Sequence, residues 1–471
     1  MMRNAVIFVF FLLCNLILFS QDQIEVKVLK LSGDIPNGKI SVQKIANSSN
    51  PISKKRPSKI KLYPNIEFQT IEGIGGAFNE IGGEALMSLP KVLQDQVMGN
   101  LFNPQHGAGF SFSRTAVGSS DFGLEAYSYS EIAEDYNMKH FSIKREETSV
   151  IPYIQKAFVQ NPKLKLFASP WSPPAWMKYS GYMDRGDEFK EKNRLKDEPN
   201  IYEAYALYFV KYITAYAKKG ITVDRLVIQN ETDANTPYPS NEMPISQMSK
   251  FVKTYLRPQF KLNKINTEIW AGTFRTAAGQ LDMIELAANT EDRVLFDGIG
   301  IQYTHPQYIE QVRELFPAVK IMHTESKCYN GNNTWEQASS RLNEVASYLN
   351  NGSPNFCYWN MILNETTESG WNWKQNSLIN INRQTKEVSY NPDFAVMAFL
   401  SKYLVPGAKR IANFSKNSLI SVKYNNQIYV LVQNDNQDTQ VYECQIESNK
   451  PQSVEVPGQS LAVLIIKNNK K

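Results

Sequence analysis

The sequence contains few of the residue types that build metal centres or disulfide frameworks. Its 471 residues include only four histidines and four cysteines. None of the histidines has a partner at an HxxxH spacing, and no CxxC pair is present, so the usual zinc-site patterns are missing. Three cysteines follow the first 20 residues, and such an odd, sparse set excludes a disulfide-scaffolded fold. We therefore expect a protein that is stabilised by its hydrophobic core and holds no metal.

Neither positive nor negative charge is in large excess. The 51 Lys and Arg residues nearly balance the 46 Asp and Glu residues, and the net charge of +5 is small for this length. Short basic runs at residues 54–61 and 467–471 are interpreted as a solvated loop and a chain end. A nucleic-acid-binding protein would concentrate Lys and Arg on one face, so we expect no nucleic-acid partner.

Long apolar runs are absent apart from one at the start of the chain. Residues 5–19 are almost uniformly apolar, and Arg3 precedes them. This stretch is too short to span a bilayer comfortably but matches the hydrophobic core of a secretory signal peptide. We expect cleavage near Ser20 and export to the periplasm, the cell surface or the medium, with no stable membrane insertion afterwards. A lipoprotein anchor at Cys14 is disfavoured because Leu13 is not the small residue that such sites require.

Both ends of the remaining chain alternate between apolar and polar residues. The N-terminal part contains IEVKVLKL, KISVQKI and KIKLYP, and the C-terminal part contains SLISVKY, QIYVLVQND and SVEVPGQSLAVLIIK. This period of two predicts short antiparallel strands. With residues 1–20 as the signal peptide, we expect residues 21–65 and 406–471 to form one β-sandwich beside a central domain of residues 66–405.

The central domain alternates short apolar strands with helical segments. Eight strands are predicted, at residues 71–78, 110–117, 164–171, 225–231, 267–274, 296–304, 320–326 and 355–363. Helical patterns lie between them, among others at 149–160, 201–219, 246–262, 280–289 and 334–350. Eight such units in about 300 residues predict an α/β fold, a (β/α)8 TIM barrel with a side β-sandwich built from both chain termini. A doubly wound sheet is the alternative, but GIGG at 73–76 lacks the spacing of a dinucleotide-binding fingerprint.

Two of the predicted strands end in a carboxylate. The fourth strand ends at Glu231 in VIQNE, and the seventh contains Glu325 in MHTE. The C-terminal ends of barrel strands carry the catalytic groups, so both side chains are expected to face one central cleft. Cleavage of a glycosidic bond needs such a pair, one carboxylic acid to protonate the leaving oxygen and one carboxylate to attack the sugar or activate water. Each glutamate taken alone is also compatible with an ordinary surface position.

Neighbouring residues favour a sugar-binding cleft. Asn230 directly precedes Glu231 and is suited to hydrogen-bond a sugar 2-hydroxyl, a contact that strengthens in the transition state. SPWSPPAWMKYSG follows the third strand, and all seven tryptophans lie within the barrel segment. We expect Trp270 and Trp335 to pack in the core, and the tryptophans at or after strand eight to lie at the rim. These three residues are Trp359, Trp371 and Trp373.

Six sequence blocks in order, IEGIGGAFNE, FSFSRTAVGSSDF, ASPWSPPAWMK, VIQNET, HTESKC and YWNMILN, resemble glycoside hydrolase family 30. This family includes glucosylceramidase-like enzymes and bacterial β-1,6-glucanases. The resemblance extends from about residue 66 into the C-terminal strands, and it implies the same barrel with a side β-sandwich. It also implies that Glu231 is the catalytic acid/base and Glu325 the nucleophile.

The same matching implies roles for further residues. Those that would line the sugar subsite are Asp121, Trp171, Asn230 and Trp359, and Arg114 would hold the catalytic carboxylates in place. Two blocks depart from the family pattern: Glu80 replaces a frequent Asp, and IQYTHP follows strand six where an aromatic residue and a histidine are common. In this block we therefore expect roles that differ from those in the family, at Gln302, Tyr303 or His305. Tyr303 is included among the candidate substrate-binding residues.

We predict a secreted retaining β-glycosidase that acts on carbohydrate, namely on β-linked glucosides or glucan, by double displacement. This mechanism requires no metal or organic cofactor. The same mechanism on a β-fucoside, galactan or xylan is the alternative. A third hypothesis is a non-catalytic polysaccharide-binding protein. The presence of both Glu231 and Glu325 disfavours it.

Overall fold

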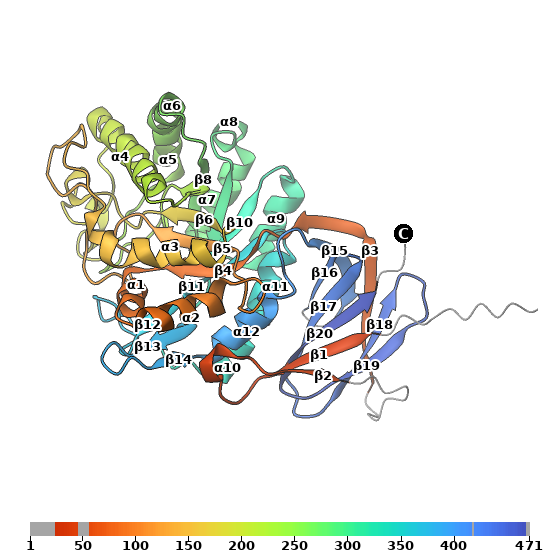
Figure 1. The fold of residues 1–471 in the computed structure, drawn as a ribbon. Coiled ribbons are helices and arrows are strands. Elements are labelled where there is room, and N and C mark those ends of the chain that lie inside the picture. The colour runs from red at the N-terminus through yellow and green to blue at the C-terminus, as the bar shows by residue number, and fades with distance from the viewer. Residues whose placement is uncertain (1–23, 46–55, 417–418, 468–471) are drawn as a thin grey trace, which may run out of the picture.

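The computed structural model describes residues 24–45, 56–416 and 419–467. The predicted signal peptide lies outside these ranges. The described chain forms a barrel of alternating strands and helices, with a separate β-sheet packed beside it (Figure 1). No helix in the described ranges is long and apolar enough to cross a membrane.

The barrel contains eight parallel strands in the hydrogen-bonded order β10-β9-β8-β7-β6-β5-β4-β11. Their bounds are β4 Gly73–Phe78, β5 Phe112–Ala116, β6 Lys165–Ser169, β7 Arg225–Val227, β8 Glu268–Phe274, β9 Gly298–Gln302, β10 Ile321–Glu325 and β11 Asn355–Asn360. Each of them falls within a predicted strand. Their side chains are almost all buried, as expected for parallel strands that are covered by helices. The predicted TIM barrel is therefore confirmed.

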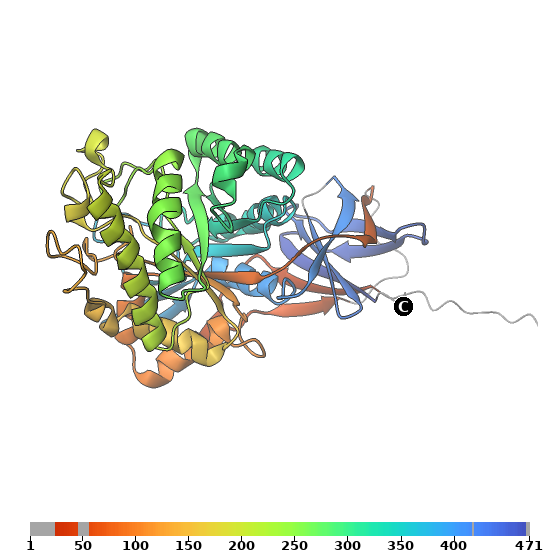
Figure 2. The same ribbon diagram turned by 90° about the horizontal axis from the view of Figure 1, so that it is seen from above.

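Helices surround the strands (Figure 2). They are α1 Glu80–Met87, α2 Lys91–Phe102, α3 Val150–Gln160, α4 Pro199–Lys218, α5 Ile245–Phe251, α6 Arg257–Leu262, α7 Thr276–Ala288, α8 Thr290–Arg293, α9 Pro306–Leu315, α10 Trp335–Ser339, α11 Arg341–Leu349 and α12 Pro392–Ser401. The helix predicted at 246–262 contains a π-helical turn, Val252–Leu256, between α5 and α6. Pro258 lies just after this turn and has no N–H to donate, which accounts for the local change in hydrogen bonding.

The side sheet contains nine strands from both ends of the chain, in the order β19-β18-β3-β15-β16-β17-β20-β1-β2. Their bounds are β1 Glu25–Lys30, β2 Val42–Ile45, β3 Ser58–Thr70, β15 Lys409–Ser415, β16 Ile420–Tyr424, β17 Gln427–Asn434, β18 Gln440–Ile446, β19 Gln452–Val456 and β20 Ser460–Lys467. N-terminal β1 pairs with β20, and β3 pairs with both β15 and β18. The expected pairing of the two chain ends is thus confirmed. A separate hydrophobic core, which includes Leu62, Val430 and Leu464, lies within this sheet.

One small sheet was not predicted. It consists of β12 Ile362–Asn364, β13 Ile379–Ile381 and β14 Val388–Tyr390. Each strand is only three residues long, which is too short for a recognisable alternation. This sheet follows β11 directly, so it fixes the segment that carries Trp371 and Trp373 close to the end of the last barrel strand.

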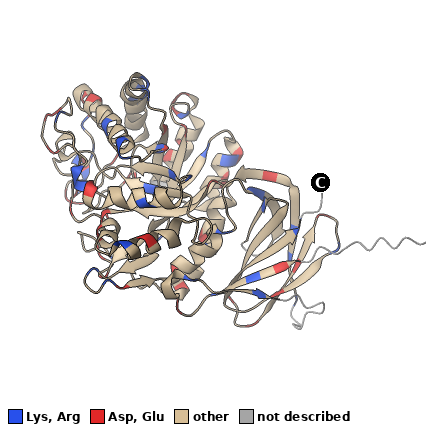
Figure 3. Cartoon of the chain, in the orientation of Figure 1, with Lys and Arg blue, Asp and Glu red and all other residues tan. Residues whose placement is uncertain are grey.

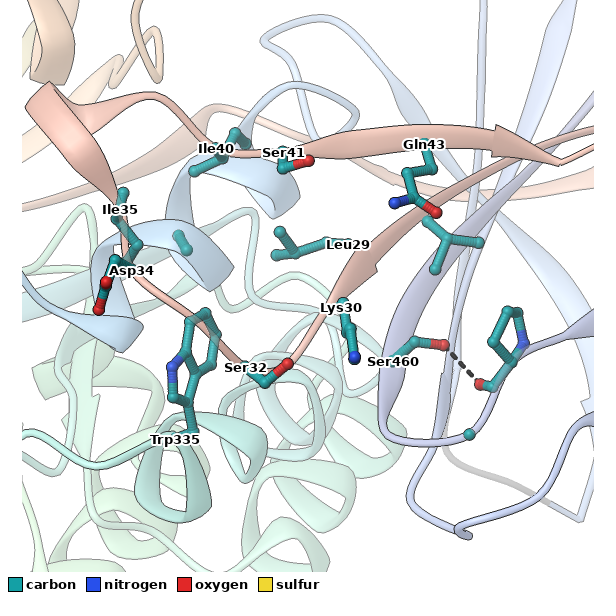
Figure 4. Close-up of a pocket in the computed structure, with 14 residues that line it drawn as sticks. Leu29, Lys30, Ser32, Asp34, Ile35, Ile40, Ser41, Gln43, Trp335 and Ser460 are labelled. Carbon is teal, nitrogen blue, oxygen red and sulfur yellow. Dashed lines mark hydrogen bonds between the residues drawn. The ribbon is translucent and has the colours of Figure 1, made fainter.

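The barrel and the side sheet enclose a cavity of about 420 Å³ (Figure 4). Trp335, which we expected in the core, is half-buried and lines this cavity together with Lys30, Asp34 and Gln43. Its indole N–H donates to the carbonyl oxygen of Gly33 at 3.1 Å. Trp270, by contrast, is 1% exposed and lies in the core, as expected.

Candidate active site

The two glutamates lie at the C-terminal ends of their strands. Glu325 is the last residue of β10, and Glu231 follows β7 after three further residues. Glu231 has φ +46°, and its backbone N–H donates to Thr273 Oγ1 at 3.0 Å. A left-handed conformation is uncommon for a residue with a side chain and costs on the order of 1–3 kcal/mol. The barrel therefore holds Glu231 in a fixed, unfavourable backbone geometry at the point where the strand ends.

The side-chain amide of Gln302 joins the two carboxyl groups. Its Nε2 donates to Glu231 Oε1 at 3.1 Å and to Glu325 Oε2 at 3.3 Å. Because both carboxyl oxygens bond to the same nitrogen, Glu231 Oε1 and Glu325 Oε2 can be no farther apart than the two distances added together. Inverting glycosidases need carboxyl groups about 6.5–9.5 Å apart to admit a water molecule, and retaining ones have about 5–5.5 Å. The Gln302 bridge thus favours the retaining arrangement.

Arg114 contacts only one of the two glutamates. Its Nη1 lies 2.8 Å from Glu325 Oε2, and its Nη2 donates to Asn230 Oδ1 at 2.7 Å. Ser169 Oγ accepts from the same guanidinium. The side chain is fully buried, so this ion pair is little screened by solvent. The expectation that Arg114 holds both carboxylates needs correction, because no hydrogen bond within the described residues joins it to Glu231.

Glu231 has a different partner, Arg275, which lies at the end of β8. Arg275 Nη1 is 3.1 Å from Glu231 Oε2, and Arg275 Nε is 3.2 Å from Asp233 Oδ1. Burial raises the pKa of Glu231 to about 7, the charge of Glu325 adds to this increase, and the charge of Arg275 opposes it. Glu231 is therefore suited to be protonated near neutral pH while its partner Glu325 is ionised, the division that an acid/base and a nucleophile require.

Tyr303 also contacts Glu325. Its hydroxyl donates to Glu325 Oε1 at 2.5 Å, and its backbone has φ +52°. Burial and the charge of Glu325 raise the pKa of Tyr303 well above its ordinary value, so the hydroxyl remains a donor. Tyr303 thus fixes the orientation of the proposed nucleophile. His305, from the same block, lies outside this contact and caps α9 by accepting from the backbone N–H of Gln307.

Two buried polar groups lie near the pair of glutamates. Asp121 Oδ1 and Trp359 Nε1 are buried without a well-formed hydrogen bond in the described structure, although the Trp359 side chain lies near enough to the Asp121 carboxyl group to oppose the rise of its pKa. Burial, followed by the charges of Glu325 and Glu231, raises the pKa of Asp121 well above its ordinary value. Buried polar groups are normally hydrogen-bonded. A buried donor and acceptor in this position suit sugar hydroxyls; the sugar contacts that the family resemblance implies for these two residues stay a prediction.

Asn230 also leaves hydrogen-bond donors for a ligand. Its Oδ1 accepts from Arg114 Nη2 and, at 3.3 Å, from Thr273 Oγ1. The oxygen is thereby occupied, and within the described residues no acceptor is bonded to its amide N–H groups. These donors are left for a ligand, consistent with the expected contact to a 2-hydroxyl.

The tryptophans divide into a buried set and a rim set. Trp171 and Trp359 stack on each other with ring centroids 5.0 Å apart, and the guanidinium of Arg114 lies 4.4 Å from the Trp171 centroid. Both rings are buried against the Arg114 guanidinium, so the expectation that Trp359 lies at the rim was wrong. Trp373, by contrast, is 47% exposed and packs near Tyr238, whose pKa is raised by burial and by the charge of Glu231. Trp373 therefore lies at the rim of the catalytic pair.

The sequence alone did not single out Arg275, Thr273 or Ser169. Arg275 directly follows the predicted strand 267–274, so its position at the catalytic end of the barrel was a usable signal. Thr273 and Ser169 lie at the ends of β8 and β6, and no motif distinguishes them from ordinary strand residues. No group of three or more metal-binding side chains is found in the described ranges, and Cys328, Cys357 and Cys444 are buried free thiols.

A parallel eight-stranded barrel with two close carboxyl groups at the C-terminal ends of its strands is the arrangement that glycoside hydrolases use. The chain belongs to glycosyl hydrolase family 30, whose TIM-barrel domain it matches over residues 71–404.

Several relatives have related activities in their names. "Putative glucosylceramidase 3" of Caenorhabditis elegans is 31% identical over 75% of this chain and 70% of that protein. Lysosomal acid glucosylceramidase of Mus musculus is 26% identical over 76% of this chain and 73% of that protein. Endo-1,6-beta-D-glucanase neg1 of Aspergillus fumigatus is 26% identical, with coverages of 72% and 71%.

Solved structures share the fold. SrfJ from Salmonella typhimurium has a TM-score of 0.83 at 22% identity and covers 94% of this chain and 99% of its own. An endo-β1,6-glucanase has a TM-score of 0.81 at 20% identity and covers 95% of this chain and all of its own. The match extends beyond the barrel, since coverage of this order includes the side sheet.

Proposed function

We propose that this protein is an exported retaining β-glycosidase that hydrolyses β-linked glucosides or glucan by double displacement. The observation that carries the proposal is the Gln302 bridge between two carboxyl groups in opposite environments. Glu325 has a buried guanidinium at 2.8 Å, and the pKa of Glu231 is raised to about 7. One group is therefore an anion and the other an available acid at the same pH.

In the first step, Glu325 attacks the anomeric carbon and forms a glycosyl-enzyme, while Glu231 gives its proton to the departing glycosidic oxygen. Arg114 and Tyr303 orient the attacking carboxylate. Asn230 and Asp121 are positioned to hydrogen-bond the sugar as its ring becomes oxocarbenium-like. In the second step, Glu231 takes a proton from water, the water oxygen bonds to the anomeric carbon, and Glu325 leaves as a carboxylate.

The role of Glu231 changes between the steps because the charge of Glu325 changes. Once Glu325 is esterified it is neutral, so one of the causes that raise the pKa of Glu231 disappears. The pKa of Glu231 then falls, which favours its action as a base on water.

Glucosides are proposed as substrates because the relatives at 26–31% identity are named for glucosylceramide or β-1,6-glucan. Export is proposed from the apolar segment at residues 5–19. Mass spectrometry of the mature N-terminus after expression with the full leader tests this second part. An intact N-terminus in the cell pellet would contradict it.

The activity is tested with a panel of aryl β-glycosides, β-glucans including β-1,6-glucan, galactan and xylan, with analysis of the products. Proton NMR of early product is expected to show the β-anomer, because two displacements retain configuration. Replacing Glu325 by Gln is expected to abolish hydrolysis while the protein stays folded, and azide is not expected to restore β-product. Glu285→Gln, at an exposed position on α7, is the matched control and keeps full activity. An early α-anomer, or substantial activity in Glu325→Gln, would refute the mechanism.

A further inference from the structure

A second cavity, of about 980 Å³, lies where the barrel meets the side sheet. Its wall includes the first residues of β7, β8 and β10, which are Arg225, Glu268 and Ile321. These residues lie at the N-terminal ends of the strands, opposite the end that carries Glu231 and Glu325. The cavity is therefore separate from the catalytic site.

Two arginines meet on one aromatic ring in this cavity. Arg410 comes from β15 of the side sheet and Arg313 from α9 of the barrel, and Figure 3 colours the Lys and Arg positions blue along the ribbon. The guanidinium carbon of Arg410 lies 3.7 Å from the Phe68 ring centroid, and that of Arg313 lies 4.9 Å from it. Both guanidinium groups are thus held against one ring, and the charge of Arg313 acts on Arg410.

Arg410 is 6% exposed, and within the described residues its side chain makes one hydrogen bond, from Nε to Gln69 Oε1 at 3.2 Å. Within the described residues, no carboxylate lies within 4.0 Å of a nitrogen of Arg410 or Arg313, and Arg313 donates to the carbonyl oxygen of Asn350 at 3.3 Å. Burial, and then the charge of Arg313, lowers the pKa of Arg410 to about 10. A buried guanidinium is normally paired, so this arrangement lacks a counterion.

The carboxylates on the cavity wall do not supply that counterion. Glu67 pairs with Lys423 at 2.5 Å, and Glu72 and Glu268 both pair with Arg225, at 2.8 and 2.9 Å. The wall also includes Glu310 and Glu314, which are exposed on α9, and Lys320, which lies 3.8 Å from Glu268. Glu67, Glu72 and Glu268 are thus already paired with other cations, whereas no ion pair in the described ranges joins a carboxylate to Arg410 or Arg313.

The loop after α11 completes the site. Gln69, which orients Arg410, is itself fixed because its Nε2 donates to the carbonyl oxygen of Ser353 at 2.9 Å. Gly352 has φ +101°, and a Cβ there would lie 3.0 Å from Arg313 Cδ. The positive φ favours glycine at this position, and the loop packs closely against the Arg313 side chain.

We propose that Arg410 and Arg313 form a binding site for an oxyanion of the phosphate type, either the free ion or a phosphate group on a larger molecule. Guanidinium groups bind phosphate through paired N–H···O bonds, and the ligand would neutralise two like charges at once. Because the arginines come from different bodies, bound anion would also join the side sheet to the barrel. This proposal is independent of the glycosidase activity, since the site lies at the other end of the barrel.

The test is the melting temperature Tm of the full mature protein against inorganic phosphate, with ionic strength held constant with NaCl. A ligand that binds only the folded state raises Tm in a concentration-dependent manner. We expect a saturable rise for the wild type and its loss in Arg410→Gln and in Arg313→Gln. Lys156→Gln removes one positive charge from α3 and should respond as the wild type does.

Two further measurements make the result decisive. If Arg410→Gln does not fold, Arg313→Gln carries the test, because Arg313 is only partly buried. Isothermal titration is expected to give one site per chain, and glucose 6-phosphate is compared with inorganic phosphate to distinguish a phosphate ester from the free ion. The proposal is overturned if the wild type shows no response beyond that to NaCl, or if Arg410→Gln and Arg313→Gln respond as the wild type does.

Discussion

Arg275 Nη1 lies 3.1 Å from Glu231 Oε2, on the opposite carboxyl oxygen from the one that Gln302 contacts. The proposed acid/base is thus held by two different donors, one charged and one neutral. Arg275 stabilises the ionised form of Glu231, whereas burial and Glu325 stabilise the protonated form. The pKa of Glu231, about 7, is the balance of these effects, so this pKa should change when either the charge of Arg275 or that of Glu325 is removed.

Replacing Arg275 by Gln should raise the pKa of Glu231, since an opposing positive charge is lost. Glu231 must be protonated to start the reaction, so the high-pH limb of the kcat/KM profile should move upward, by roughly one pH unit. The profile with a natural β-glucoside measures this. Arg383→Gln, which breaks an ion pair with Glu84 elsewhere on the barrel, is the control and should leave the limb unchanged. A limb that moves downward would show that Arg275 does not set the charge state of Glu231.

Replacing Tyr303 by Phe removes the hydroxyl that donates to Glu325 and leaves the ring in place. A hydrogen bond to a charged group contributes about 1.5–3 kcal/mol, and 1.4 kcal/mol corresponds to a tenfold change in rate. We expect kcat to fall about tenfold or more, with a smaller effect on KM. Steady-state kinetics on an aryl β-glucoside provide the measurement. Tyr403→Phe, at the junction with the side sheet, should retain the wild-type kcat.

Replacing Glu231 by Ala separates the acid step from the base step. Natural linkages need a proton on the leaving oxygen, so their hydrolysis should slow by about 10²–10⁴-fold. An aryl glycoside with an acidic phenol needs little protonation, so its first step should survive and the glycosyl-enzyme on Glu325 should accumulate. Azide needs no base and should restore turnover, yielding a β-glycosyl azide that NMR identifies. Equal slowing of good and poor leaving groups, with no effect of azide, would make Glu231 a structural carboxylate.

A buried carboxyl group outside the active site should make stability depend on pH. Glu146 accepts hydrogen bonds from Tyr127 and Tyr129 at 2.8 and 2.7 Å and also from Tyr216. Burial, the largest effect, raises its pKa to about 7, although the tyrosine hydroxyls oppose the increase. The folded state therefore retains the proton that the unfolded state loses first. Between the unfolded pKa of about 4.3 and about 7, the free energy of unfolding should fall by up to roughly 1.4 kcal/mol per pH unit.

Replacing Glu146 by Gln mimics the protonated group and should remove this part of the pH dependence. Urea unfolding at several pH values between 5 and 8 measures the free energy of unfolding of both proteins. The loss of stability on going from pH 5 to pH 8 should be smaller in the variant. Glu67→Gln is the control: the pKa of Glu67 is lowered by Lys423, so this group does not titrate in that range. Parallel curves for Glu146→Gln and the wild type would refute the assignment.

Local sequence was enough to predict the barrel and the position of both glutamates. Strands that are buried on both faces appear as short apolar runs, and this pattern depends only on neighbouring residues. Glu231 and Glu325 were recognisable because each stands where such a run ends. The strands from the two chain ends were predicted in the same way, from their period of two.

Only the tertiary structure decided which side chains meet. Gln302 reaches both glutamates, Arg275 reaches Glu231 but not Glu325, and Arg114 does the reverse. These contacts depend on the closure of the barrel, which brings together residues that are dozens to hundreds of positions apart, and no local pattern encodes such distances. The pKa of Glu231 likewise follows from burial and from neighbouring charges that exist only in the folded chain. The sequence by itself therefore determined the barrel and its two carboxylates, whereas folding set the burial and the neighbouring charges that raise the pKa of Glu231, because charge and burial act through space and not along the chain.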